Sequence, residues 1–147
     1  DVMADLNAQA ESLRTAVAGL PEERGSYAYA EGKWTIKELL SHMIDGERIF
    51  AYRILRISRG DKTPIEGFEQ DDYIATSRAN ERTFANLLDE FEHERKANLI
   101  LVSNIDEETA KLTGTASGKP VSVRALTYIM AGHVKHHMTI LAERYLG

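Results

Sequence analysis

The strongest constraint on the fold is the spacing of apolar residues, which recur every three or four positions in four separate segments. This is the period of an amphipathic α-helix, and no stretch alternates for long as a half-buried strand does. The segments cover residues 3–20, 36–59, 77–104 and 122–146. A chain of 147 residues is long enough to bury one core. The sequence therefore predicts an all-α four-helix bundle that forms a single domain over residues 1–147.

The second segment carries the clearest helix start. Thr35 followed by Glu38 fits a capping box, in which the threonine hydroxyl and the glutamate carboxylate each accept a backbone N–H bond. Trp34 and Leu39 fit the hydrophobic staple that flanks such a start. Gly60 can take the left-handed conformation that ends a helix. We therefore expect this helix to run for about 25 residues, or about 38 Å.

Long connections separate the segments. Residues 61–76 hold a cluster of acids beside two aromatic residues, and residues 106–120 are polar with two glycines. Residues 22–33 form a shorter polar connection. Long connections in compact domains are often functional. An acid of residues 69–72 is a candidate for lining the entrance to a site, although a solvent-facing acid is the simpler interpretation of each.

The composition limits the chemistry. The chain contains no cysteine, which excludes disulfides, thiolate metal sites and cysteine nucleophiles and leaves imidazole and carboxylate as metal ligands. A formal net charge of −5 at pH 7 disfavours binding to nucleic acid or anionic lipid. No apolar run approaches the ~20 residues that span a membrane, and the first residues are amphipathic rather than signal-like. We therefore expect a cytoplasmic protein that binds neither nucleic acid nor membrane.

Three of the five histidines lie in the last segment, and they do not all lie on the same face of its helix. His133 and His137 lie on its apolar face, about 40° apart around the axis and about 6 Å apart along it. Both can therefore reach one ion at a metal–nitrogen distance of ~2.1 Å. His136 falls at the margin of this face and is expected to meet a groove or solvent. Two imidazoles leave a metal under-coordinated, so this interpretation requires a third ligand from another helix.

His42 in the second segment is the candidate for the third ligand. It lies beside the apolar stripe, on a line with Glu38, Gly46 and Arg53. A glycine inside a helix lowers its stability by about 1 kcal/mol relative to alanine. The presence of Gly46 is explained if another group approaches the backbone there. Glu38 and Asp45 lie within a turn of His42 and are candidates for orienting its free N–H, although a solvent-facing acid is the simpler interpretation of each.

The same histidines admit a simpler explanation. A His-x-x-x-His pair can be half-buried and hydrogen-bonded without any metal, and convergence of His42 on the pair is not visible in a sequence. Val134 follows His133, so the glutamate base of a His-Glu-x-x-His zinc protease is missing. No general base or other catalytic residue is assigned.

Several arginines follow His42 along the same segment, namely Arg48, Arg53, Arg56 and Arg59. They are a candidate clamp for the anion of a carboxylated substrate. Cations near a helix C-terminus also complement the helix dipole, which is the simpler explanation for most of them. Arg53 is the exception, because it lies on the same side of the predicted helix as His42.

Three stretches carry a family resemblance, namely residues 34–48 (WTIKELLSHMIDGER), 67–73 (GFEQDDY) and 131–137 (AGHVKHH). They resemble the DinB-like superfamily of metalloenzymes, also called the YfiT-like fold, and the resemblance covers essentially the whole chain. It implies a four-helix bundle with long crossover connections and a mononuclear metal site. The family's ligands fall on His42, His133 and His137, and the usual ion is zinc or nickel.

The residues and the resemblance leave two functions open. The first is a metal-dependent enzyme that activates water or a low-molecular-weight thiol to act on a small-molecule substrate, as a hydrolase or a thiol S-transferase. Characterised members of the superfamily that the chain resembles include transferases that use bacillithiol or mycothiol and a thiol-dependent isomerase. The second is a non-catalytic helical binding or scaffolding module with a structural or vestigial metal site. The sequence also leaves open whether two copies pair as a homodimer.

Overall fold

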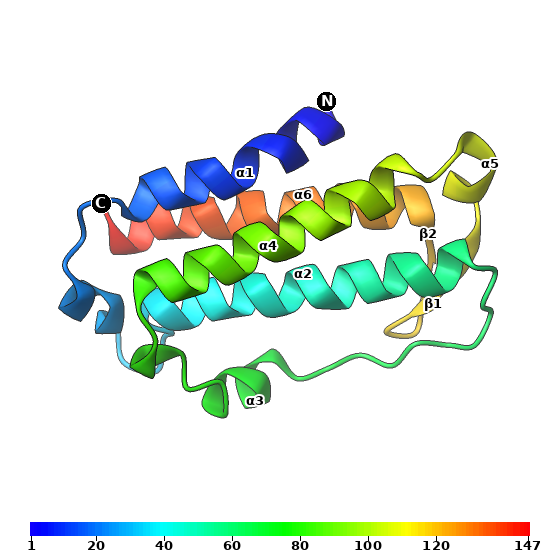
Figure 1. Cartoon of the computed structure of the whole chain (residues 1–147). Coiled ribbons are helices and arrows are strands. Elements are labelled where there is room, and N and C mark those ends of the chain that lie inside the picture. Colours follow the sequence, from blue (N-terminus) through cyan, green and yellow to red (C-terminus); the bar gives the residue numbers. More distant parts are fainter.

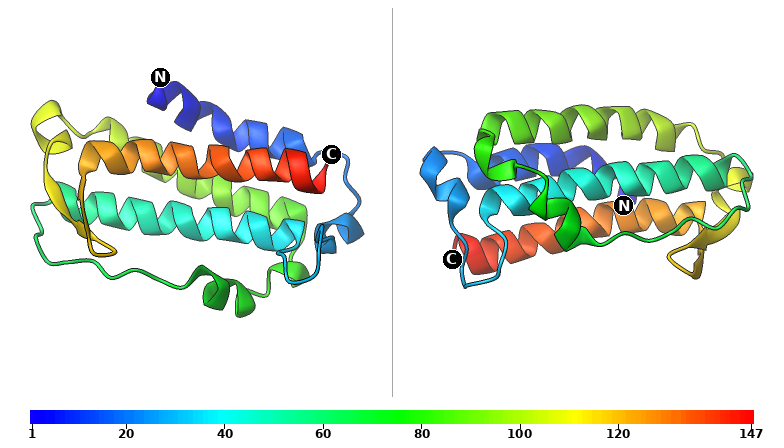
Figure 2. Two further views of the ribbon diagram at one scale, coloured as in Figure 1. Left: turned by 180° about the vertical axis from the view of Figure 1, so that it is seen from behind. Right: turned by 90° about the horizontal axis from the view of Figure 1, so that it is seen from below.

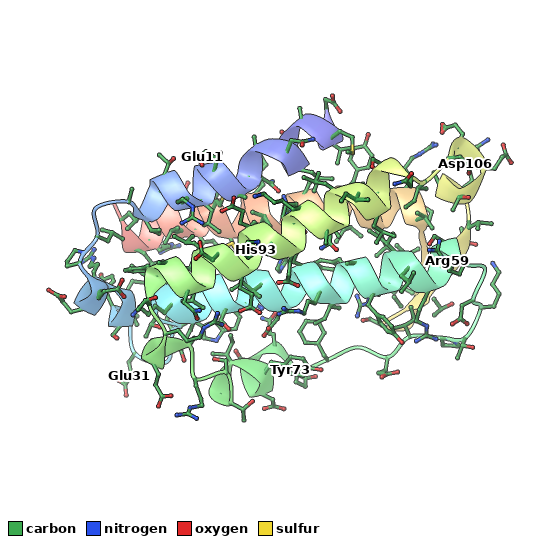
Figure 3. The ribbon with its side chains drawn as sticks, viewed as in Figure 1. Glu11, Glu31, Arg59, Tyr73, His93 and Asp106 are labelled. Carbon is green, nitrogen blue, oxygen red and sulfur yellow. The ribbon has the colours of Figure 1, made fainter.

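The computed structural model describes residues 1–147 and confirms the four-helix bundle (Figure 1). Its long helices are α1 (Val2–Val17), α2 (Ile36–Ser58), α4 (Phe84–Ser103) and α6 (Val123–Ile140). α1 and α6 run in one direction and α2 and α4 in the other (Figure 1). α1 and α2 each pack against both α4 and α6, so that α1 and α2 lie diagonally opposite (Figure 2). No helix is both long and apolar enough to cross a membrane.

Because α2 and α4 are parallel, the chain must return along the bundle to connect them. A helix of 23 residues, such as α2, is about 34 Å long. Residues 59–83 cover this distance along the outside of the bundle and form a crossover connection (Figure 1; Figure 2, right). This connection contains the helix α3 (Gln70–Ala75) and a 3₁₀ turn (Ala79–Glu81), both packed against α2. The long crossover implied by the family resemblance is therefore confirmed.

α2 begins as predicted. The Thr35 hydroxyl accepts a hydrogen bond from the Glu38 N–H at 3.1 Å, and a Glu38 carboxylate oxygen accepts one from the Thr35 N–H at 2.9 Å. The Tyr145 hydroxyl donates to the Trp34 carbonyl at 2.7 Å, which ties the helix entry to the end of the chain. At the other end, Gly60 takes the expected left-handed conformation with φ +79°.

The other helix boundaries differ from the predictions where a residue takes a left-handed conformation. α1 ends at Val17 rather than at residue 20, and Gly19 turns the chain with φ +80°. α4 begins at Phe84 rather than at residue 77, because Arg78 has φ 57° and Thr83 caps the helix start. Two further short elements are a 3₁₀ turn (Glu22–Ser26) before α2 and a π-helical segment (Leu141–Tyr145) that continues α6.

The connection between α4 and α6 holds structure that was not predicted. It contains helix α5 (Glu107–Ala110) and an antiparallel hairpin of β1 (Thr113–Ala116) and β2 (Lys119–Ser122). Ser117 and Gly118, with φ of 52° and 77°, form a two-residue turn with the positive angles of a type I′ hairpin. The Ile65 N–H donates to the Thr115 carbonyl and the Ser117 N–H to the Ile65 carbonyl, both at 2.9 Å. The hairpin thus anchors the crossover connection beside α2.

A buried ion pair lies between the two apolar clusters of the core. Arg95 and Glu47 are each 1% exposed, and the guanidinium donates two hydrogen bonds to the carboxylate at 2.7 and 2.9 Å. Arg95 also donates to the Leu6 carbonyl and to the Gln9 side-chain oxygen, both at 2.9 Å. The Gln9 amide in turn donates to the Ala131 carbonyl at 2.8 Å. This network joins all four long helices and fixes their register.

Candidate metal centre

α2 and α6 bring the three predicted histidines together. The Nε2 atoms of His42 and His133 are 3.0 Å apart. Each of His42, His133 and His137 offers a ring nitrogen, and these nitrogens all lie within 4.8 Å of one another. Two nitrogens bound to one tetrahedral zinc ion at ~2.1 Å are themselves about 3.4 Å apart. The observed separations, 3.0 Å for one pair and at most 4.8 Å for the others, include the separation that one shared cation requires.

A simple hydrogen bond between His42 and His133 would also account for their short contact. It would leave the Nδ1 atom of His137 buried without a hydrogen-bond partner, as this atom is in the structure. A buried polar atom without a partner costs about 1–3 kcal/mol. A hydrogen bond joins only two of the three rings, whereas one cation can bind a nitrogen of each, so the donor set fits a metal ion better than a hydrogen bond.

Burial keeps these imidazoles neutral. Desolvation, followed by repulsion from the neighbouring histidines, lowers the pKa of His133 to about 3 and that of His137 to about 4. Desolvation also lowers the pKa of His42, against the attraction of the Asp71 carboxylate. Neutral imidazole is the form that binds metals, so all three rings are in the ligating form at neutral pH.

Gly46 makes room for the His133 ring. A Cβ atom at position 46 would lie 2.5 Å from Cε1 and 2.8 Å from Nδ1 of His133, far closer than real side chains approach. The prediction that another group approaches the α2 backbone at Gly46 is therefore confirmed. His136, on the same helix as His133, is exposed as predicted.

The Gly46→Ala variant is expected to displace the His133 ring and to lower the affinity for zinc by at least about tenfold, an effect of the size seen when a ligand loses its orienting contacts. The helix itself should persist, because alanine favours a helix by about 1 kcal/mol over glycine. Gly132→Ala is the matched control, since a Cβ there meets nothing within 4 Å. Isothermal titration with zinc measures both, and equal affinities of Gly46→Ala and the unmodified protein would contradict the prediction.

A cavity of about 700 Å³ opens beside His42 and His133. α2, the crossover connection and the hairpin turn supply its other walls, which are Gly46, Phe50, Arg53, Gly67, Phe68, Glu69, Gln70 and Ser117. A smaller pocket of about 270 Å³ reaches His137 between Trp34 and Tyr145. Two pockets therefore reach the histidine cluster.

The weaker predicted site residues fall into two groups. Gly46 and Arg53 line the cavity beside the histidines. Glu38 is engaged in the capping box, and Asp45 lines a separate pocket with Arg82. Neither carboxylate hydrogen-bonds the His42 ring, so the geometry gives no support to the expectation that they orient it.

Trp34 was not predicted as part of the site, whereas Asp71 is one of the acids of residues 69–72 that were expected at its entrance. The Trp34 ring packs against the His42 ring with centroids 4.7 Å apart, and its indole N–H donates to the Asp71 carboxylate at 3.1 Å. Ser117 and Gln70 were also missed, because both come from connections that reach the cavity through tertiary contacts. The acidic run around Asp71 was the one signal in the sequence that pointed to this wall.

Known proteins resemble this chain in sequence. The sequence profile of the DinB superfamily matches residues 5–141. A protein of Geobacillus thermodenitrificans named "Putative metal-dependent hydrolase" is 30% identical over 132 residues, which are 86% of this chain and 72% of that protein. A protein of Geobacillus kaustophilus with the same description is 29% identical over 135 residues, which are 89% of this chain and 75% of that protein.

Solved structures share the fold. YfiT from Bacillus subtilis, described as a probable metal-dependent hydrolase with an unusual four-helix bundle topology, superposes with a TM-score of 0.87 at 14% identity, over 97% of this chain and 82% of that chain. The mycothiol-dependent maleylpyruvate isomerase superposes with a TM-score of 0.74 at 15% identity, over 93% of this chain and 58% of that chain. At these identities the likeness concerns the fold alone. Because the DinB superfamily profile matches nearly the whole chain, the chain belongs to the DinB superfamily.

Proposed function

We propose that this protein is a metal-dependent hydrolase of small molecules that holds one divalent ion, zinc or nickel, with His42, His133 and His137. One observation carries the proposal: ring nitrogens of three neutral imidazoles lie within 4.8 Å of one another beside an open cavity of about 700 Å³. Imidazole is a common ligand of both zinc and nickel. The descriptions of the Geobacillus relatives as metal-dependent hydrolases agree with this function.

The ion, when bound, supplies a strong Lewis acid, because three neutral ligands leave it doubly charged and able to lower the pKa of water to about 7. The chain positions the three histidines and forms the walls of the cavity beside them. The buried Arg95–Glu47 network holds α2 and α6 in register, and Phe50 and Phe68 give the cavity apolar walls. Glu69 is the one carboxylate that lines the cavity, and its side chain is exposed.

A second candidate function is a thiol-dependent transfer or isomerisation. The likeness of the fold to a mycothiol-dependent isomerase favours it. The chain has no cysteine, so the thiol must come from a small molecule. A metal-bound thiol is deprotonated and is then a nucleophile. The same three-histidine site is therefore compatible with either nucleophile, and the cavity selects between them.

The test compares zinc-loaded, nickel-loaded and metal-free protein on a panel of small esters, amides and lactones, each with and without a low-molecular-weight thiol. Turnover that requires metal but no thiol is the expected result. Turnover that requires both would favour the second candidate. Stoichiometric metal binding without turnover of any substrate would contradict both and would favour a non-catalytic binding or scaffolding module.

A further inference from the structure

Arg53 is a buried cation without a carboxylate partner. It is 8% exposed, its Nε atom is buried without a hydrogen bond, and Nη2 donates to the Ser117 hydroxyl at 3.2 Å. The other buried cations, Lys37 and Arg95, are each paired with a glutamate. Because buried charges are normally paired, Arg53 carries a desolvation cost that no carboxylate within the fold offsets.

Arg53 and the histidine cluster line the same cavity. The Phe50 ring lies near both groups, with its centroid 5.2 Å from the centroid of the His133 ring and 6.0 Å from the guanidinium carbon of Arg53. The distance from the guanidinium carbon of Arg53 to the centroid of the His133 ring is therefore at most the sum of these two distances. A molecule in this cavity that touches both groups therefore has the apolar Phe50 ring as one of its walls.

We propose that Arg53, together with the Ser117 hydroxyl, binds a carboxylate of the substrate while the bond to be hydrolysed lies at the histidine end of the cavity. This inference rests on the proposed function and names its substrate class, a small carboxylic acid with an apolar segment between its two ends. The planar guanidinium donates in a fork that matches a carboxylate. Its Nε–H has no partner within the fold.

The charges around the cavity favour a carboxylate over a phosphate. Arg53 is the one arginine or lysine that lines the cavity, and the carboxylate of Glu69 lies at its rim. A phosphate monoester carries nearly two negative charges at neutral pH. One cation neutralises a carboxylate but leaves a phosphate with excess charge near Glu69. A monoanion is therefore the better match.

The reaction that follows is a balanced hydrolysis. The oxygen of one water bonds to the acyl carbon, the bond from this carbon to its oxygen or nitrogen substituent breaks, and the departing atom takes a proton. Arg53 does not touch the reacting atoms. It holds the distant carboxylate and thereby sets which bond lies beside the histidines.

The experiment uses hydroxamates, which bind zinc directly, as probes of the zinc-loaded protein. The monohydroxamates of adipic, pimelic and suberic acid each carry a free carboxylate at the far end, and their methyl esters lack its charge. We expect the best acid to bind at least about tenfold more tightly than its ester, the size expected for a charge-assisted hydrogen bond. Arg53→Met should abolish this ratio. Arg56→Met is the matched control, because Arg56 pairs with Asp61 and does not line the cavity.

The outcomes separate this inference from the proposed function. Equal binding of acid and ester to the unmodified protein would overturn the inference and leave the metal site standing, whereas failure of every hydroxamate to bind would contradict the metal site itself. Tighter binding of the matching phosphonate would overturn the choice of a carboxylate.

Arg53→Met should keep or raise the melting temperature, because it removes an unpaired buried charge. A large fall in melting temperature with an unchanged acid-to-ester ratio would assign Arg53 a structural role and overturn the inference.

Discussion

Replacing Arg95 with alanine is expected to lower the free energy of unfolding by about 3–5 kcal/mol, because it leaves the buried Glu47 carboxylate without its cation. For a chain of this size the loss corresponds to a fall in melting temperature of about 6–20 °C. Urea unfolding, followed by circular dichroism, measures the change in free energy. A loss below about 1 kcal/mol would contradict the structure's placement of this pair.

Two controls separate burial from charge. Arg14→Ala removes another arginine that joins α1 to α4, but its partners Asp89 and Glu92 are partly exposed. Its expected cost is below about 1 kcal/mol. The double variant Arg95→Met with Glu47→Leu removes both charges and fills the space with apolar groups, so it should recover most of the stability. A double variant as unstable as Arg95→Ala would mean that the hydrogen bonds of Arg95 to Leu6 and Gln9 dominate.

The His137→Ala variant is expected to bind zinc at least about 100-fold more weakly than the unmodified protein. The loss of a group that merely orients a metal ligand costs 10–100-fold, and removal of a ligand itself costs at least as much. His137 contributes a ring nitrogen that lies within 4.8 Å of the ligand atoms of His42 and His133. A competition titration against a chelator of known affinity measures the change.

The exposed neighbour His136 provides the matched control for His137→Ala. His136→Ala should leave zinc affinity unchanged within about twofold, since that side chain faces solvent. Zinc at 100 times its dissociation constant should raise the melting temperature of the unmodified protein and of His136→Ala by about 5–10 °C. The same zinc concentration should stabilise His137→Ala by much less. Equal shifts in all three proteins would remove the premise of a three-histidine site.

Several features of the site were predictable from the sequence because they depend on local geometry. The i, i+4 spacing of His133 and His137 places both on one helix face whatever the rest of the chain does. The Thr35–Glu38 capping box fixes where α2 starts and therefore which face carries His42. An unexplained glycine at position 46 correctly indicated a close approach to the α2 backbone.

The buried ion pair was missed although the sequence carried a signal for it. Glu47 lies four residues after Met43 in the apolar stripe of its helix, and Arg95 lies four after Phe91 in its own. Opposite charges at stripe positions of two helices are a pattern that indicates a buried pair. The packing of α2 on α4 makes the two positions face each other.

The sequence by itself determined the helices, their apolar faces and the histidines that share those faces, because helical periodicity and capping act within a few residues. Only the tertiary structure decided that His42 meets His133, that the hairpin holds the crossover connection over α2, and that Arg53 is buried without a partner. Each of these depends on contacts between residues far apart in the chain. Such contacts follow from the packing of whole elements, which no local pattern of residues specifies.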